Sequence, residues 1–138
     1  MNILFDTNVI LDVIEQRHSY YPQAALLMAA VEHGQLTGLL CATTVTTLFY
    51  LTRKRVGSLP AQTEIAQLLQ LYQVAPVTHA VLLAATTLGM MDYEDAVLHE
   101  SARLAGADGI VTRNEADFRR ASMAIYTPEM LLRLLNAS

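Results

Sequence analysis

The sequence predicts an α/β fold with a mainly parallel five-stranded sheet, on three observations. Short apolar runs with strand character alternate with longer segments of helical spacing along the 138 residues, which is the pattern of repeated β–α units. Glycine, proline and capping residues stand at the boundaries between these segments. We find no linker, internal repeat or low-complexity stretch. The chain is therefore predicted to be one domain spanning residues 1–138.

The first half of the chain contains three expected helix starts. The apolar run 3–5 ends at Asp6, and apolar residues then recur at helical spacing over 9–14. Pro22 begins a second helix, which ends at Gly34. A second strand is predicted over 39–42, and Thr43 or Thr44 is the expected cap of a helix that runs to residue 55.

The second half repeats the same alternation. Helices are expected at 60–72, 79–88, 92–105 and 115–120 and from residue 128 onward. Strands are expected at 74–77, 109–112 and 124–126. Asp92 is the expected N-cap of its helix, and Gly106 is expected to end that helix. These elements complete the five predicted strands.

Composition restricts the class of protein. Apolar residues make up 53% of the chain and charged residues 16%, which excludes a disordered protein and suggests an interface with a partner. The net charge of −4 means that a nucleic acid would need a local basic patch or a metal ion for binding. Cys41 is the single cysteine, and we identify neither a signal peptide nor a membrane span. We expect a cytoplasmic protein.

The acidic residues occur where strands end or helices begin. Asp6 ends the first predicted strand, Asp117 follows the fourth, and Asp92, Glu94 and Asp95 begin a helix. Because ligands bind beyond the carboxyl ends of parallel strands, we expect these acids to gather at one crevice. On its helix, Asp95 lies at the edge of the apolar face and is expected to point inward.

Carboxylates that share a pocket repel one another unless a cation offsets their charge. Mg²⁺ and Mn²⁺ prefer oxygen ligands, and such an ion can activate water and screen a phosphodiester. The neighbouring polar residues suit this chemistry, because Thr7 and Asn8 begin a helix whose N–H groups favour a phosphate. Thr112, Arg113 and Asn114 add two hydrogen-bonding groups and a cation near Asp117.

Three segments resemble the motifs of the PIN domain family, and they occur in the order that the family has. These segments are Asp6-Thr7-Asn8-Val9-Ile10-Leu11-Asp12, Asp92-Tyr93-Glu94-Asp95-Ala96-Val97 and Ile110-Val111-Thr112-Arg113-Asn114-Glu115-Ala116-Asp117-Phe118. The resemblance covers essentially the whole chain. It implies a three-layer α/β/α fold and a metal-dependent endoribonuclease, often the VapC-like toxin of a type II toxin–antitoxin pair. It also implies an RNA substrate, a homodimer and a small antitoxin protein as partner.

Carried over to this chain, the resemblance implies that Asp6, Asp95 and Asp117 bind Mg²⁺ or Mn²⁺, with Asp92 or Glu94 assisting. The residues that position water, phosphate or the RNA backbone are then Thr7, Asn8, Thr112, Arg113 and Asn114. The family usually places a further acid, most often Glu, on the helix after the second strand. Thr47 stands at that position here, so Asp92 or Glu94 is expected to supply the missing carboxylate.

Several of these residues also have a purely structural interpretation. Asp6 and Asp92 can act only as helix N-caps, and Glu94 can be stabilised by the helix dipole alone. His99 is expected to be structural, because hard metal ions favour oxygen ligands. Asp12 is expected to be solvated or paired with a basic residue.

Two other functions compete with the nuclease. An aspartate that ends the first strand is also the nucleophile of haloacid-dehalogenase-like phosphatases, but those need a second Asp where this chain has Asn8. The other alternative is a PIN-like module that binds RNA or protein with weak catalysis or none, and Thr47 is the best argument for it.

Overall fold

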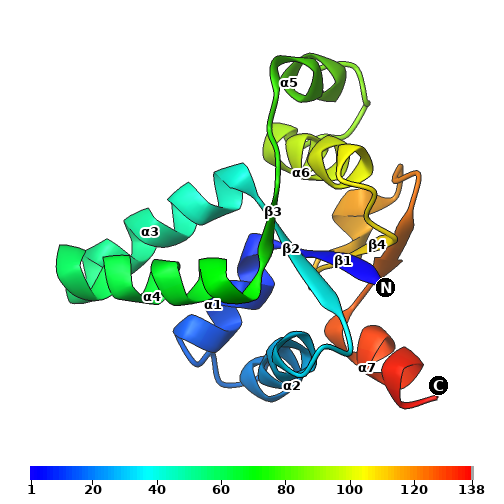
Figure 1. Cartoon of the computed structure of the whole chain (residues 1–138). Coiled ribbons are helices and arrows are strands. Elements are labelled where there is room, and N and C mark those ends of the chain that lie inside the picture. The colour runs from blue at the N-terminus through cyan, green and yellow to red at the C-terminus, as the bar shows by residue number, and fades with distance from the viewer. Residues whose placement is uncertain (138) are drawn as a thin grey trace.

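The computed structural model of the protein describes residues 1–137, and a five-stranded sheet lies at its centre (Figure 1). The strands are β1 (Asn2–Phe5), β2 (Thr37–Cys41), β3 (Gln73–Ala75), β4 (Gly109–Val111) and β5 (Ala124–Tyr126). Their spatial order is β3-β2-β1-β4-β5, and all four neighbouring pairs are parallel. Since β1 is the central strand, the residue that follows it lies in the middle of the sheet's carboxyl edge.

Helices cover both faces of the sheet, which confirms the predicted three-layer α/β/α architecture. They are α1 (Thr7–Ile14), α2 (Tyr21–Glu32), α3 (Ala42–Val56), α4 (Ser58–Leu71), α5 (His79–Ala85), α6 (Tyr93–Leu104), the 3₁₀ helix η1 (Glu115–Phe118) and α7 (Pro128–Asn136). Each parallel pair of strands needs a crossover, and helices provide these crossovers.

Two hydrophobic cores lie on opposite faces of the sheet. One packs residues of α1, α2, α3, α4 and α7 against Ile3, Phe5 and Leu40. The other packs α5, α6 and η1 against Leu4, Leu39 and Ile110. Alternate residues of β1 therefore enter different cores, as the two-residue period of a strand requires.

The predicted elements agree with the structure in type and order, and a few boundaries differ. The helix after β2 begins at Ala42 with Cys41 at the N-cap and no side-chain cap, so the expectation of a threonine cap is wrong. The Thr44 hydroxyl is instead paired with that of Thr7, 2.8 Å away. The expected N-cap role of Asp92 is confirmed, because its Oδ1 accepts from the backbone N–H of Asp95 at 3.2 Å.

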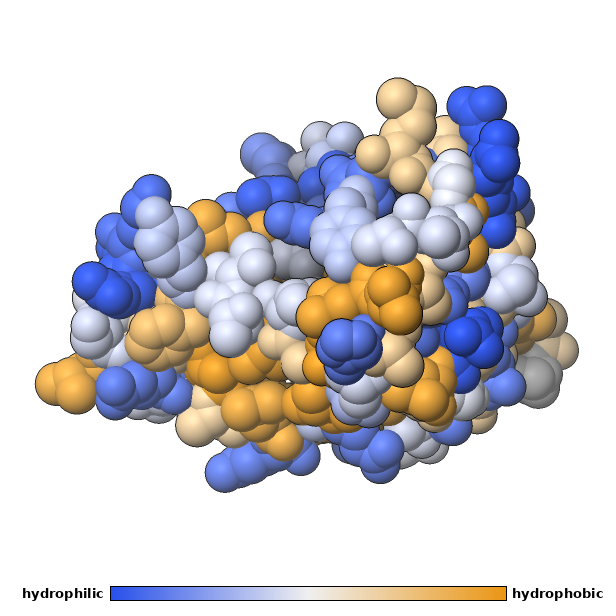
Figure 2. All heavy atoms as spheres, turned by 90° about the horizontal axis from the view of Figure 1, so that it is seen from above, coloured by the Kyte–Doolittle hydropathy of each residue, from blue (hydrophilic) through white to orange (hydrophobic). Residues whose placement is uncertain are grey.

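Helices α3 and α4 form an arm that projects to one side of the molecule (Figure 1). The basic run 53–55 lies at the tip of this arm, away from α6 and η1 (Figure 1). Arg55 pairs there with Glu64 at 3.4 Å. Seen from above, apolar side chains gather over the region of α5 and along the arm (Figure 2), and Leu83 and Leu59 are among the exposed apolar residues.

None of the described helices combines the length and apolarity that crossing a membrane requires.

Candidate active site at the carboxyl edge of the sheet

Asp6 is held at the end of β1 by bonds to three neighbouring residues. Its Oδ1 accepts from the backbone N–H of Thr7 at 2.7 Å. Its Oδ2 accepts from the Thr112 hydroxyl at 2.7 Å and from Asn8 Nδ2 at 3.3 Å. Burial raises the pKa of Asp6, while the bond from Thr112, the bond from Thr7 and the charge of Arg113 oppose that rise. Asp6 is thus both an N-terminal cap of α1 and a fixed carboxylate.

Thr112 connects the end of β4 to Asp6. Its side chain is fully buried, and its hydroxyl accepts from the backbone N–H of Asn114 at 3.0 Å while it donates to Asp6. A hydroxyl can do both, because it has one donor hydrogen and two acceptor lone pairs. The chain of bonds holds the start of the 112–117 loop against the carboxylate of Asp6.

Asp95 lies on the first turn of α6 and is surrounded by like charges. Burial raises its pKa to about 7, and the charges of Asp6, Asp92, Asp117 and Glu94 raise it as well. No hydrogen bond reaches its carboxylate from the residues that the structure describes. The other four predicted acids therefore act electrostatically on Asp95, which a gathering at one edge of the sheet explains.

Three of these acids are exposed around the more buried pair. Asp117 belongs to η1, where its N–H donates to the Asn114 carbonyl at 2.9 Å. Asp92 and Asp117 both line a hollow of about 430 Å³ beside η1. Glu94 lines a different hollow, on the α3 side of α6. The outer acids are thus distributed on two sides of Asp95.

Thr47, at the position of the expected further acid, lines the same hollow as Glu94. This hollow, of about 190 Å³, is walled by hydroxyl groups from α3 and by α6; its polar residues include Thr7, Thr43, Thr44, Thr46 and Thr47. A carboxylate residue of α6 and the threonine position on α3 therefore line the same hollow. Sequence reasoning did not find the threonine cluster, because no motif marks it.

Arg113 is engaged in a buried ion pair instead of lying free among the acids. Its Nε donates to Asp12 Oδ2 at 2.7 Å, and its guanidinium lies 4.0 Å from the centre of the Tyr20 ring. Asp12 is fully buried, and Arg17 Nη1 lies 3.7 Å from its other oxygen. The expected pairing of Asp12 with a basic residue is therefore what the structure shows.

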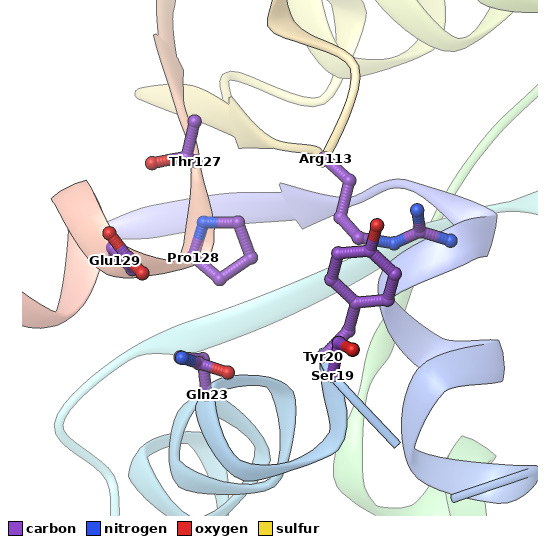
Figure 3. A pocket seen from close by; sticks show the side chains of 7 residues that line it. All are labelled: Ser19, Tyr20, Gln23, Arg113, Thr127, Pro128 and Glu129. Carbon is purple, nitrogen blue, oxygen red and sulfur yellow. The ribbon is translucent and has the colours of Figure 1, made fainter. Parts of the chain in front are cut away.

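A third concave region lies beside Arg113 and Tyr20 (Figure 3). It measures about 290 Å³ and is lined by Ser19, Tyr20, Gln23, Arg113, Thr127, Pro128 and Glu129. Figure 3 shows the side chains of Arg113 and Tyr20 close together on one side and Pro128 and Glu129 across from them. None of the five clustered acids lines this region.

His99 has a structural role, as expected. Its ring is buried, and Nε2 accepts from the backbone N–H of Ser122 at 3.0 Å. Nε2 must then be unprotonated, so Nδ1 carries the hydrogen and donates to Glu100 Oε2 at 2.8 Å. Burial raises the pKa of Glu100, but bonds from Arg103 and His99 outweigh it and lower that pKa. The network holds the chain that follows η1.

The donor set suits a hard divalent cation. The clustered side chains offer carboxylate oxygens, which Mg²⁺ and Mn²⁺ prefer. The Asn8 Oδ1 atom is also buried without a hydrogen-bond partner among the described residues, although its Nδ2 donates to Asp6. Within residues 1–137, however, no three acidic, His or Cys side chains already stand in an assembled metal-binding group. The residues fit the ion by chemistry, and the side chains must close around it.

Comparison with known proteins identifies the class. The PIN domain model matches residues 2–116, so the chain belongs to the PIN domain family. This assignment favours the nuclease over the phosphatase alternative. A search among curated proteins gives no significant match.

Solved structures of toxin–antitoxin systems share the fold. VapBC2 from Rickettsia felis, solved with a promoter DNA fragment, superposes with a TM-score of 0.68 at 18% identity, covering 92% of this chain and 98% of that one. A toxin–antitoxin complex from Klebsiella pneumoniae superposes with a TM-score of 0.68 at 19% identity, covering 91% of this chain and 97% of that one. VapC20 from Mycobacterium tuberculosis, a toxin that cleaves the sarcin–ricin loop, superposes with a TM-score of 0.60 at 16% identity. That superposition covers 78% of this chain and 86% of that one. The chain thus has a VapC-like PIN domain fold.

Proposed function

We propose that this protein is a Mg²⁺- or Mn²⁺-dependent endoribonuclease that hydrolyses RNA phosphodiester bonds. The observation that supports it best is the arrangement of acids at the carboxyl edge of the sheet: Asp6 is fixed at the end of β1, Asp92 and Asp117 line one hollow, and burial and these neighbours raise the pKa of Asp95. A site that concentrates this much negative charge is stabilised when a cation binds it. Strongly perturbed pKa values also cluster at functional sites.

Asp6, Asp95 and Asp117 would hold the ion, and Asp92 or Glu94 would assist. When bound, the ion supplies positive charge to the scissile phosphate and lowers the pKa of water. Asp6 is oriented for this by Thr112 and Thr7 before any ligand arrives. Holding ligands in place beforehand reduces the entropy that binding must overcome.

The polar residues around the acids have distinct roles in the proposal. Asn8 donates from its Nδ2 to Asp6, and its buried Oδ1 has no partner among the described residues, so its role is to hold Asp6 and to accept a hydrogen bond from a water that enters the site. The hydroxyl group of Thr7 is bonded to Thr44 and that of Thr112 to Asp6, so these two threonines position α1 and Asp6. Asn114 remains exposed and free to orient the substrate. Arg113 has its Nε committed to Asp12, so only its outer guanidinium N–H groups are left for an RNA phosphate.

The metal site is tested by titrating Mn²⁺ into wild type and Asp95→Asn by calorimetry, beside cleavage of a structured RNA. We expect saturable binding and cleavage in wild type, and the loss of both in the variant. Glu32→Gln is the matched control, because Glu32 is an exposed acid on α2 and forms no ion pair among the described residues. Wild type that neither binds Mn²⁺ nor cuts RNA would favour the binding module without catalysis.

The role of Glu94 is tested by Glu94→Gln and Thr47→Glu. Both residues line the hydroxyl-rich hollow, so we expect the first change to weaken Mn²⁺ binding and the second to strengthen it. The double variant should bind close to the wild-type affinity, because it moves the carboxylate from α6 to α3. Equal affinities in all four proteins would exclude this hollow from the metal site.

We further propose a homodimer and a small antitoxin protein as partner. The Klebsiella pneumoniae relative was solved as a toxin–antitoxin complex. This chain also leaves large apolar residues exposed, among them Leu26, Leu59 and Leu83. Light scattering of the purified chain would measure its mass, and a monomer at micromolar concentration would contradict the dimer. Co-expression with the product of an adjacent small reading frame would test for the antitoxin.

A further inference from the structure

The hollow beside η1 combines acids with two unpaired cations. It measures about 430 Å³ and is lined by residues of η1, of the chain that follows η1 and of the loop that joins α5 to α6. Asp92 and Asp117 line it, and so do Arg119 and Arg120. Within residues 1–137, neither arginine forms an ion pair or a hydrogen bond, although both share a hollow with two carboxylates.

Arg120 is placed by backbone geometry. A Cβ atom added to Gly89 would lie 3.2 Å from Arg120 Nη1 and within 3.9 Å of Cδ and Cζ. Gly89 has a φ of +80°, a conformation that side chains rarely adopt. The arginine therefore crosses from the chain after η1 and rests against the α5–α6 loop, and the glycine leaves room for it.

We propose that this hollow is the subsite for the nucleotide next to the scissile phosphate of a single-stranded RNA, with Arg119 and Arg120 binding its backbone phosphates. This inference rests on the proposed ribonuclease function and specifies its substrate. The protein has a net charge of −4, so RNA cannot be held by overall charge. Unpaired arginines beside the acids provide the local positive charge that an RNA phosphate needs in order to bind a protein of negative net charge.

The lining of the hollow favours a single strand over a duplex. Met90 and Met91 line it beside the arginines, and Met91 is fully exposed. An apolar, adaptable side chain can contact the face of a base, which is accessible only when the base is unstacked. The hollow has room for one splayed nucleotide, whereas a duplex would present only phosphates and groove edges to it.

The other basic residues do not serve this position. Arg113, Arg55 and Arg103 are each in ion pairs, with Asp12, Glu64 and Glu100 respectively. The basic run at the tip of the arm lies away from η1 (Figure 1). The pair at 119–120 is therefore the cationic group that shares a cavity with the candidate active site.

The test measures RNA binding without divalent ions, so that cleavage cannot interfere. A labelled single-stranded 12-nucleotide RNA of mixed sequence is titrated in EDTA at 50, 100 and 200 mM KCl. The variant is Arg119→Ala/Arg120→Ala. The control is Arg53→Ala/Arg133→Ala, which removes the same charge from two exposed arginines that have no ion pair among the described residues. Thermal unfolding of all proteins confirms that they are folded.

We expect the 119/120 variant to bind at least about tenfold more weakly. The slope of log K against log salt should fall by about 1.4, because each single-strand phosphate contact contributes about 0.7. The control should change Kd less than about twofold. Arg119→Lys/Arg120→Lys should recover much of the affinity, since it restores the charge. Affinity and slope equal to the control, or no RNA binding by wild type, would overturn the subsite.

Two further measurements separate this inference from the proposed function. A duplex of the same length that binds wild type as tightly as the single strand, with the same loss in the variant, would overturn the single-strand assignment. If wild type with Mn²⁺ cuts no RNA but the 119/120 variant still loses binding, the nuclease proposal fails and the subsite stands. If wild type with Mn²⁺ cuts RNA but the 119/120 variant binds RNA as wild type does, the nuclease proposal stands and the subsite fails.

Discussion

Replacing Asp95 with asparagine should stabilise the metal-free protein, although it removes a proposed metal ligand. The ionised carboxylate of Asp95 is part-buried among four other acids and accepts no hydrogen bond from the described residues. Asparagine has nearly the same shape and no charge. The change therefore removes repulsion without breaking a bond that the structure shows.

The magnitude follows from the pKa of Asp95. A rise from 3.8 to about 7 corresponds to about 4 kcal/mol against the ionised form, at about 1.4 kcal/mol per unit. Because Asp95 keeps part of its surface in water, screening reduces the measurable share to about 1–2 kcal/mol. In a domain of this size, each kcal/mol raises Tm by about 3–5 °C.

The pH dependence has a definite sign. The folded protein keeps the Asp95 proton up to about pH 7, whereas the unfolded chain releases it near 3.8. The stability that this difference provides is fully present below pH 4 and is lost as the pH rises through 7. The advantage of Asp95→Asn over wild type is therefore largest above pH 7 and disappears toward pH 4.

Urea unfolding in EDTA at pH 4.5, 6 and 8 measures this difference, with Glu32→Gln as control. Adding Mn²⁺ at pH 8 should reverse the order, because an ion that binds only the folded wild type stabilises it. The reasoning is refuted if Asp95→Asn is no more stable than wild type at pH 8 in EDTA. It is also refuted if the advantage grows as the pH falls.

Three other predictions concern single buried contacts. Thr112→Val removes the bond that lowers the pKa of Asp6, so the pH profile of RNA cleavage should move to higher pH. Thr112→Ser should restore the wild-type profile, and an unchanged profile in Thr112→Val would exclude the positioning role. Arg113→Ala leaves the buried Asp12 without its main partner, so urea unfolding should show a loss of about 3 kcal/mol. The Tyr72 hydroxyl is buried without a partner among the described residues, so Tyr72→Phe should keep or raise stability by up to about 1 kcal/mol in the same assay.

The sequence determined the fold class and the position of every strand to within a few residues. Strand and helix periodicities are local properties, and the residues that carry them are visible in the chain. The three segments that resemble the family motifs were also visible for this reason, and the match of the family model to residues 2–116 confirms the family. The N-cap role of Asp92 was predictable because capping depends on the next three residues alone.

Only the tertiary structure decided which side chains are engaged and which are free. Thr112 and Asp6 are 106 residues apart, and Arg113 and Asp12 are 101 apart, so no local pattern foretells either bond. For the same reason, the sequence could not distinguish the committed Arg113 from the unpaired Arg119. Contacts across the sheet depend on strand order, which the chain specifies only through the packing of its two cores.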